Sequence, residues 1–229
     1  MTLMKTFLGA AATLALGAGA ALADPALIYD LGGKFDKSFN EAAYGGAMRW
    51  VEETGGSYKE LEMQSEAQRE QALSRLAESG ANPIVMTGFA FGDVLNSVAP
   101  EYPDTKFVII DMVVDQPNVR SIVFTEEQGS YLVGMMAAKA SKTGTVGFIG
   151  GMDIPLIRKF ACGYVQGVKA ANPDAVVVQN MTGTTPSAWN DPVKGSELTK
   201  AQISQGADVI YAAAGGTGIG VLQTAADEG

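Results

Sequence analysis

The segment Lys106-Phe107-Val108-Ile109-Ile110-Asp111 decides the fold class of this 229-residue chain. Four apolar residues in a row, without polar alternation, are typical of a strand that is buried on both faces of a parallel sheet. Similar short apolar runs recur along the chain. They predict strands at 26–29, 58–63, 84–86, 106–110, 119–124, 145–149, 175–180 and 208–212.

Longer segments with helical periodicity lie between these runs. They predict helices at 39–53, 67–79, 92–99, 128–141, 155–171, 192–205 and 218–228. Strand and helix alternate almost strictly, which is the pattern of a parallel sheet covered by helices on both faces. The sequence therefore predicts an α/β fold.

One polar, turn-like break divides the chain. The stretch Ser141-Lys142-Thr143-Gly144 ends a predicted helix, and a new strand begins at Thr145. We place the boundary there, giving an N-terminal α/β lobe at 24–143 and a C-terminal α/β lobe at 144–229. The second lobe then has only three strands and three helices, and Gly229 resembles a helix C-cap before a further strand. We expect this lobe to be truncated.

The first 23 residues have the three-part organisation of a secretory signal peptide. Lys5 precedes an apolar run over 7–21, and the small residues Ala21 and Ala23 stand before Asp24. A transmembrane anchor or a buried first helix are the alternatives, but the run is short and Asp24-Pro25 follows at once. We expect cleavage after Ala23 and a periplasmic protein. Because no Cys stands at the cleavage point, we expect no lipid anchor.

The amino-acid composition argues against several classes of function. With 25 acidic and 16 basic residues, the formal net charge is −9, which disfavours a nucleic-acid-binding surface. The chain has no His and a single Cys, so it can build no Ser-His-Asp triad and no Cys/His zinc site. We predict no catalytic residues, no metal and no cofactor, and we interpret Cys162 as a small buried residue on a helix.

Ligands of open α/β sheets bind beyond the carboxyl ends of the strands, so those turns are the candidate sites. After the first strand, Ser38 and Glu41 have the spacing of a capping box, which would start a helix with its free N–H groups toward the cleft. Phe39 and Asn40 lie in that first turn, where an aromatic face and an amide could hold a planar polar ligand. Phe39 could equally be a core residue.

Two further residues stand at strand or helix ends. Asp111 follows four apolar residues directly, so its carboxylate is either exposed at the end of a strand or begins a loop before Pro117. Trp189 lies in a polar loop just before Asp191, a predicted N-cap, and Pro192, a predicted first helical residue. It is either a packing residue or a stacking platform at the cleft.

The glycine cluster Gly216-Thr217-Gly218-Ile219-Gly220 follows a strand and opens a helix. It lacks the spacing of the GxGxxG fingerprint, and no Lys-Ser/Thr pair makes it a phosphate-binding P-loop. Dinucleotide and ATP binding are therefore weakly supported. Its backbone amides could still hold a hydroxyl or an anionic group.

Several of these stretches, taken in order, resemble the basic membrane protein family, substrate-binding proteins of ABC transporters of which many bind purine nucleosides. The matching stretches are Asp36-Lys37-Ser38-Phe39-Asn40, Gly88-Phe89-Ala90-Phe91, Gly129-Ser130-Tyr131-Leu132-Val133-Gly134, Val146-Gly147-Phe148-Ile149-Gly150-Gly151-Met152-Asp153-Ile154-Pro155, Trp189-Asn190-Asp191-Pro192 and Ala212-Ala213-Ala214-Gly215-Gly216-Thr217-Gly218. They extend from about Ala26 to the last residue.

The resemblance implies the type I periplasmic binding protein fold, two Rossmann-like lobes joined by a hinge with the ligand between them. By this resemblance, Phe39 and Trp189 would sandwich the base. Asn40 and Asp111 would bond its edge, and Gly215 would lie near the ribose.

The sequence therefore predicts a monomeric, non-catalytic protein that binds a nucleoside-like small molecule and delivers it to an ABC permease in the inner membrane. A ligand sensor for a membrane receptor is an alternative, and a nucleoside-acting enzyme is a less favoured one. Free bases or riboflavin-like molecules are alternative ligands.

Overall fold

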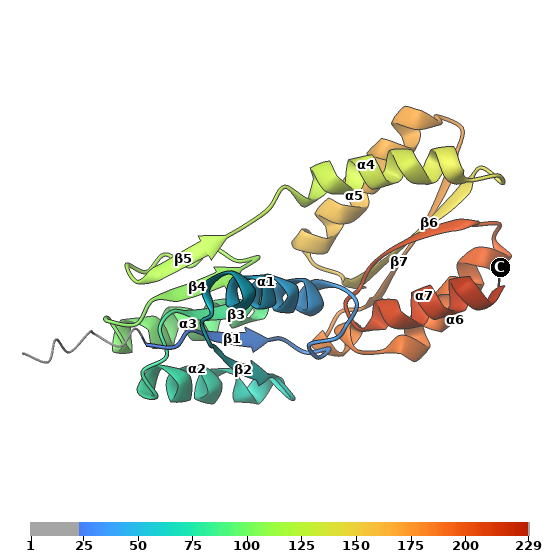
Figure 1. Ribbon diagram of the computed structural model, residues 1–229. Helices are drawn as coiled ribbons and strands as arrows, with labels where there is room; N and C mark the ends of the chain where they lie inside the picture. The colour runs from blue at the N-terminus through green and yellow to red at the C-terminus, as the bar shows by residue number, and fades with distance from the viewer. Residues whose placement is uncertain (1–22, 229) are drawn as a thin grey trace, which may run out of the picture.

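The computed structural model describes residues 23–228, whose strands form two separate parallel sheets (Figure 1). The first 22 residues of the predicted signal peptide, and the predicted C-cap at Gly229, lie outside this range. No helix among the described residues is both long enough and apolar enough to span a membrane.

The first sheet has five parallel strands in the order β2-β1-β3-β4-β5. Their bounds are β1 Ala26–Tyr29, β2 Lys59–Glu62, β3 Ile84–Thr87, β4 Phe107–Ile110 and β5 Val119–Ile122. Ile28 of β1 pairs with Leu61 on one side and with Met86 on the other. The connections after β1 and β3 therefore leave in opposite directions, which opens a crevice at the carboxyl ends of these strands.

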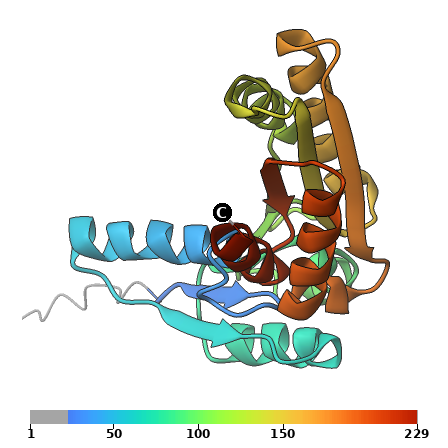
Figure 2. The ribbon, with the colours of Figure 1, turned by 90° about the vertical axis from the view of Figure 1, so that its right-hand side faces the viewer.

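Helices cover the two faces of this sheet unequally (Figures 1 and 2). Helix α1 (Phe39–Thr54) lies on one face, and helices α2 (Arg69–Glu78) and α3 (Gly92–Val98) lie on the other. The main core is on the α2–α3 side, where Leu73 and Leu95 are fully buried. Of the residues in α1, only Asn40 is buried.

The prediction that β4 is buried on both faces is correct for one face only. Phe107 and Ile109 are buried in the core, but Val108 and Ile110 are half-buried. On that face α1 buries only Asn40, so the sheet is covered less completely there than on the α2–α3 side.

The second sheet has three parallel strands in the order β7-β6-β8. Its strands are β6 Thr145–Met152, β7 Val176–Gly183 and β8 Val209–Ala213, and its helices are α4 Glu126–Ala140, α5 Pro155–Ala171, α6 Pro192–Ser204 and α7 Thr217–Glu228. Helices α4 and α5 cover one face, and α6 and α7 cover the other (Figure 1). Phe148 and Tyr164 are fully buried in its core, with ring centroids 6.0 Å apart.

Helix α4 belongs with the second sheet, although the predicted boundary at residue 144 puts it in the first lobe. Glycines allow α4 and α5 to touch at their backbones, since a Cβ on Gly134 would overlap the Tyr164 carbonyl and a Cβ on Gly167 would overlap that of Tyr131. The chain thus passes between the sheets at 123–125, before α4 rather than after it. The polar break at 141–144 does end the helix, but a helix end does not reveal which sheet the helix covers.

All eight predicted strands and seven predicted helices are present, and the fold class is confirmed. Among the strands, the largest difference in length is in β6, which runs to Met152 rather than ending at residue 149 and thereby includes Gly150 and Gly151. The 3-10 turns η1 Glu66–Gln68, η2 Phe89–Phe91, η3 Ala99–Glu101 and η4 Pro186–Trp189 were not predicted. Cys162 is exposed on α5, so its interpretation as a buried residue is wrong.

Candidate functional site

A cavity of about 320 Å³ lies between the carboxyl ends of the two sheets. The first lobe lines it with Asp30, Leu31, Asp36, Ser38, Phe39, Asn40, Ala42, Gly88, Phe89 and Asp111, and the second lobe with Leu156, Ile157, Phe160, Trp189, Tyr211, Ala212, Ala213 and Gly215. The five residues singled out from the sequence, Phe39, Asn40, Asp111, Trp189 and Gly215, all lie on its wall. The structure thus brings together side chains that are up to 176 positions apart in the chain.

The start of helix α1 is capped by Asp36, and the predicted capping box is wrong. Ser38 makes no side-chain cap bond, and Glu41 accepts from the N–H of Lys37 at 2.9 Å instead. The buried Asp36 carboxylate accepts from the N–H groups of Ser38, Asn40 and Glu41 at 2.8, 3.1 and 3.2 Å. A carboxylate with two oxygens can satisfy three donors where a Ser hydroxyl would satisfy one. Two of the predicted free N–H groups, those of Asn40 and Glu41, are therefore occupied.

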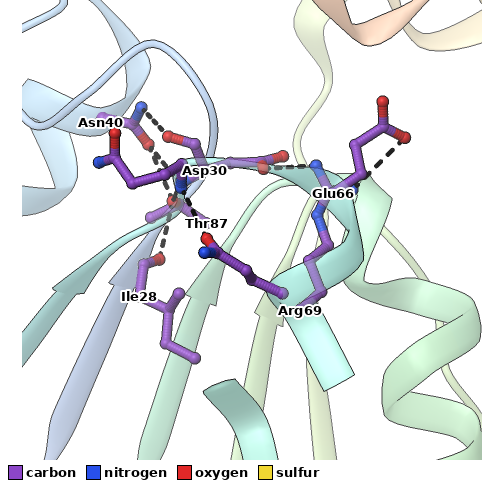
Figure 3. A network of polar contacts seen from close by, with 8 residues as sticks. Ile28, Asp30, Asn40, Glu66, Arg69 and Thr87 are labelled. Carbon is purple, nitrogen blue, oxygen red and sulfur yellow. Dashed lines mark hydrogen bonds and ion pairs between the residues drawn. The ribbon is translucent and has the colours of Figure 1, made fainter. Parts of the chain in front are cut away.

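Asn40 is fixed by a network beneath the cavity (Figure 3). Its Nδ2 donates to the carbonyls of Asp30 and Gly33 at 3.1 and 3.2 Å. Its Oδ1 accepts from the N–H of Asp30 at 3.2 Å and lies 2.9 Å from Thr87 Oγ1. Since an amide offers two donors and two acceptor lone pairs, all of its hydrogen-bonding capacity is in use. A ligand edge could bond to Asn40 only in exchange for one of these contacts.

Asp30 stands at the end of β1 and is held by a buried ion pair (Figure 3). Arg69 of α2 donates from Nη2 to Asp30 Oδ1 at 2.7 Å, and both side chains are largely removed from solvent. The Arg69 guanidinium also lies 5.4 Å from the centre of the Phe91 ring and 3.8 Å from Glu66. Arg69 therefore fixes a carboxylate on the cavity wall from behind the sheet.

Asp111 stands at the end of β4 in an unusual backbone conformation. Its φ of 69° is in the left-handed region that non-glycine residues seldom adopt. Its N–H donates to the carbonyl of Ile122 at 2.8 Å, which anchors it to the neighbouring strand. Burial, reinforced by the nearby charge of Glu126 and opposed by Lys159, raises the pKa of Asp111 to about 6.

Trp189 forms an aromatic wall in the second lobe. It ends the turn η4, and its six-membered ring lies directly against the backbone of Gly151, where any Cβ would overlap it. The ring meets Phe89 of the first lobe edge to face, with centroids 6.3 Å apart and an interplanar angle of 61°. As predicted, Asp191 then caps α6, accepting from the N–H of Lys194 at 2.9 Å, with Pro192 in the first turn.

The segment between β8 and α7 supports this wall through Thr217. Thr217 is buried, donates to the carbonyl of Ala188 at 2.8 Å and accepts from the N–H of Asp191 at 2.7 Å. The N–H of Gly218 donates to the Gly215 carbonyl at 2.8 Å. The glycines thus fit the loop around Trp189, which explains why they lack nucleotide-binding spacing.

The two lobes touch at a seam of backbone beside the cavity. A Cβ on Gly32 would lie 3.3 Å from the carbonyl oxygen of Trp189 and 3.6 Å from the nitrogen of Gly216. Gly32 also has a φ of 113°, which disfavours any other residue. The seam therefore depends on the absence of side chains.

The arrangement can hold a planar ligand between aromatic faces, with carboxylates at its edge, but it offers no metal centre. Among residues 23–228 no group of three potential ligands of the His, Cys, Asp or Glu type is close enough to hold an ion. Most of the second-lobe wall is apolar.

Comparisons with known proteins agree with this architecture. Residues 26–229 match the model of the Bmp family, described as "ABC transporter substrate-binding protein PnrA-like". The chain belongs to the Bmp family. The resemblance drawn from the sequence motifs is thereby confirmed.

Several Bmp relatives are about one-third identical to this chain. The ABC transporter nucleoside-binding protein BmpA of Lactococcus lactis is 35% identical over 205 residues, which are 87% of this chain and 57% of that protein. Basic membrane protein A1 of Borrelia garinii is also 35% identical, over 85% of this chain and 57% of that protein. The chain spans just over half the length of the curated relatives it matches.

A solved structure shows the same fold. The ABC transporter solute-binding protein of Aeropyrum pernix superposes with a TM-score of 0.81 and 33% identity, over 90% of this chain and 59% of that chain. Two archaeal relatives, from Pyrococcus abyssi and Pyrococcus horikoshii, are named lipoproteins and are 34% identical to this chain.

Of the residues described above, the sequence did not single out Asp30, Asp36, Phe89 or Gly151 as parts of the site or its support. Asp30 follows an apolar strand just as Asp111 does, so the same signal could have found it. Asp36 competes with Ser38 for the helix start, and only geometry decides between them. No local signal links Gly151 to Trp189, since 37 residues separate them in the chain.

Proposed function

We propose that this protein binds a purine-nucleoside-like molecule in the cavity and delivers it to a membrane permease. The observation that carries the proposal is one cavity that combines aromatic rings from both lobes with carboxylates at strand ends. Its volume is at the lower end of the range for small-molecule sites. The BmpA relative, whose name specifies nucleoside binding, supports this ligand class.

In this proposal the aromatic residues supply affinity. Phe39 and Trp189 line the cavity from different lobes and would hold the base between them. Stacking of this kind contributes on the order of 1–3 kcal/mol per base and tolerates any base, since each has a π-face. Phe89, already in contact with Trp189, would complete the aromatic wall.

The strand-end carboxylates supply base identity. An ionised Asp111 accepts hydrogen bonds, so it would prefer a base edge that presents a ring N–H, as in guanine or hypoxanthine. Asn40 would join the edge contact by giving up one of its present bonds. Gly215 would lie near the sugar.

Closure of the lobes would connect binding to transport. The ligand would contact both lobes only when they are together, so it would shift the equilibrium toward the closed form that the permease recognises. The predicted signal peptide supports action outside the cytoplasm. In this proposal the protein acts as a monomer, without cofactor or catalysis.

Calorimetry with inosine, guanosine, adenosine, cytidine and free ribose tests the proposal. We expect dissociation constants in the micromolar range or lower for the purine nucleosides and no binding of ribose alone. Chromatography of the mixture after long incubation should recover the nucleoside intact. Absence of binding to every purine nucleoside would overturn the proposal, and release of a free base would reassign the protein to an enzyme class.

A further inference from the structure

The N-terminus of helix α1 faces the cavity, and a carboxylate of the chain itself occupies the N–H groups of Asn40 and Glu41 there. The first N–H groups of a helix have no partner within the helix and carry partial positive charge, so they commonly bind phosphate. Here Asp36 lines the cavity and accepts from the N–H groups of Ser38, Asn40 and Glu41. Asp36 is only 2% exposed, so the carboxylate is built into the wall.

The rest of the described wall is also unsuited to an anion. Among the residues that line the cavity, three are Asp and none is Lys or Arg. Asp30 has its own cation in Arg69, which contacts it from behind the sheet. The nearby Lys159 is 3.6 Å from the buried Glu126, which faces it from the start of α4.

We propose that Asp36 is a specificity-determining residue that excludes phosphate-bearing ligands from the cavity. By accepting from N–H groups at the start of α1, its carboxylate removes donors that an anion in the cavity could otherwise bind, and it adds negative charge to the wall. This inference rests on the proposed function, because it distinguishes a nucleoside from the corresponding nucleotide.

The discrimination follows from charge and from hydrogen bonding together. A phosphate that entered the cavity would lose its water and find the N–H groups of Asn40 and Glu41 already occupied. It would also face carboxylates across a medium of low dielectric constant. A neutral nucleoside meets none of these costs. Rejection of the wrong ligand by an unfavourable charge is an effective source of specificity.

The test compares inosine with inosine 5′-monophosphate by calorimetry, in the wild type and in Asp36→Ala. We expect the wild type to bind the monophosphate at least a hundredfold more weakly than inosine. Asp36→Ala frees three N–H donors and removes one negative charge. It should therefore reduce the ratio of the dissociation constant of the monophosphate to that of inosine at least tenfold.

Asp191→Ala is the matched control. It removes a capping carboxylate from α6, but Asp191 does not line the cavity. We expect it to leave the ratio unchanged. If Asp36→Ala is folded by circular dichroism and keeps the wild-type ratio, or if Asp191→Ala narrows the ratio equally, the inference is overturned.

A second measurement separates this inference from the proposed function. Inorganic phosphate is titrated into Asp36→Ala, and the backbone amide resonances of Ser38, Asn40 and Glu41 are followed by NMR. We expect saturable shifts in the variant and none in the wild type, whether or not inosine binds. Absence of these shifts contradicts the role of Asp36, whereas absence of inosine binding contradicts only the nucleoside proposal.

Asp36→Asn covers the case in which the Ala variant does not fold. It keeps an oxygen that can accept from the helix and loses only the charge. We expect at least a threefold narrowing of the same ratio, and an unchanged ratio would overturn the inference.

Discussion

The two walls of the cavity are built in different ways. The first-lobe wall includes polar side chains that are fixed by hydrogen bonds, among them Asn40 and Asp30. The second-lobe wall is mostly apolar, and its Trp189 ring rests on the bare backbone of Gly151. The first wall has fixed charges and directional groups, which suit selection among ligands. The second has a broad apolar surface, which suits affinity without selection.

The comparison predicts that an ion pair behind the first-lobe wall contributes to the stability of the fold. Arg69→Met would leave the Asp30 carboxylate buried without its partner, and should lower the free energy of unfolding by about 3 kcal/mol. Urea denaturation measures this loss. The matched control is Arg75→Met, which changes an exposed Arg on the same helix and should stay within about 0.5 kcal/mol of the wild type. Equal losses in both variants would show that the ion pair does not support the wall.

The second wall should determine overall affinity. Trp189→Ala should weaken binding of every purine nucleoside at least tenfold, because it removes a stacking surface worth on the order of 1–3 kcal/mol. Calorimetry with inosine and adenosine should show similar losses for both. Trp50→Ala, at an exposed position on α1, is the control and should leave both dissociation constants unchanged. A loss confined to one nucleoside would mean that this wall also selects.

The selectivity of the first-lobe wall among nucleosides should depend on pH. Because the pKa of Asp111 is raised to about 6, the carboxylate is ionised above this pH and protonated below it. Inosine, which presents a ring N–H, should bind roughly tenfold more weakly at pH 5 than at pH 7. Adenosine, whose corresponding ring nitrogen is an acceptor, should not lose affinity in this range.

Asp111→Asn is the variant that tests this assignment. It cannot titrate, so the difference between inosine at pH 5 and at pH 7 should disappear. If the pH dependence persists in Asp111→Asn, another group is responsible for it.

The smallest effect should come from the support beneath the ring. Gly151→Ala places a methyl group against Trp189 and should weaken nucleoside binding about threefold by tilting the ring. Gly129→Ala adds the same methyl group where no atom lies within 4 Å, and should have no effect. If the two variants bind nucleosides with equal affinity, the position of the Trp189 ring does not determine the affinity of the second-lobe wall.

The comparison also separates what local sequence reveals from what it does not. The strand at Phe107–Ile110 could be predicted because strand formation depends on a few adjacent residues. Its terminal Asp111 was found for the same reason. The placement of α4 was wrong because it depends on backbone contact with α5, more than 25 positions away.

The candidate site shows the same division. Phe39, Asn40 and Trp189 were candidates because of their positions at strand and helix ends, and the resemblance to the family placed them at the ligand. The full engagement of Asn40 could not be foreseen, because its partner Thr87 is 47 positions away. The cap at Asp36 was missed because Asp36 and Ser38 could each cap the helix, and only the hydrogen-bond geometry shows which one does.

The contact between Trp189 and Gly151 has a practical consequence for spectroscopy. The chain contains only two tryptophans, and the other, Trp50, is 39% exposed on α1. In a Trp50→Phe protein, the indole emission would therefore come from the cavity wall alone. Because the carbonyl of the same residue lies at the seam between the lobes, this single fluorophore would register both the arrival of a ligand and the approach of Gly32.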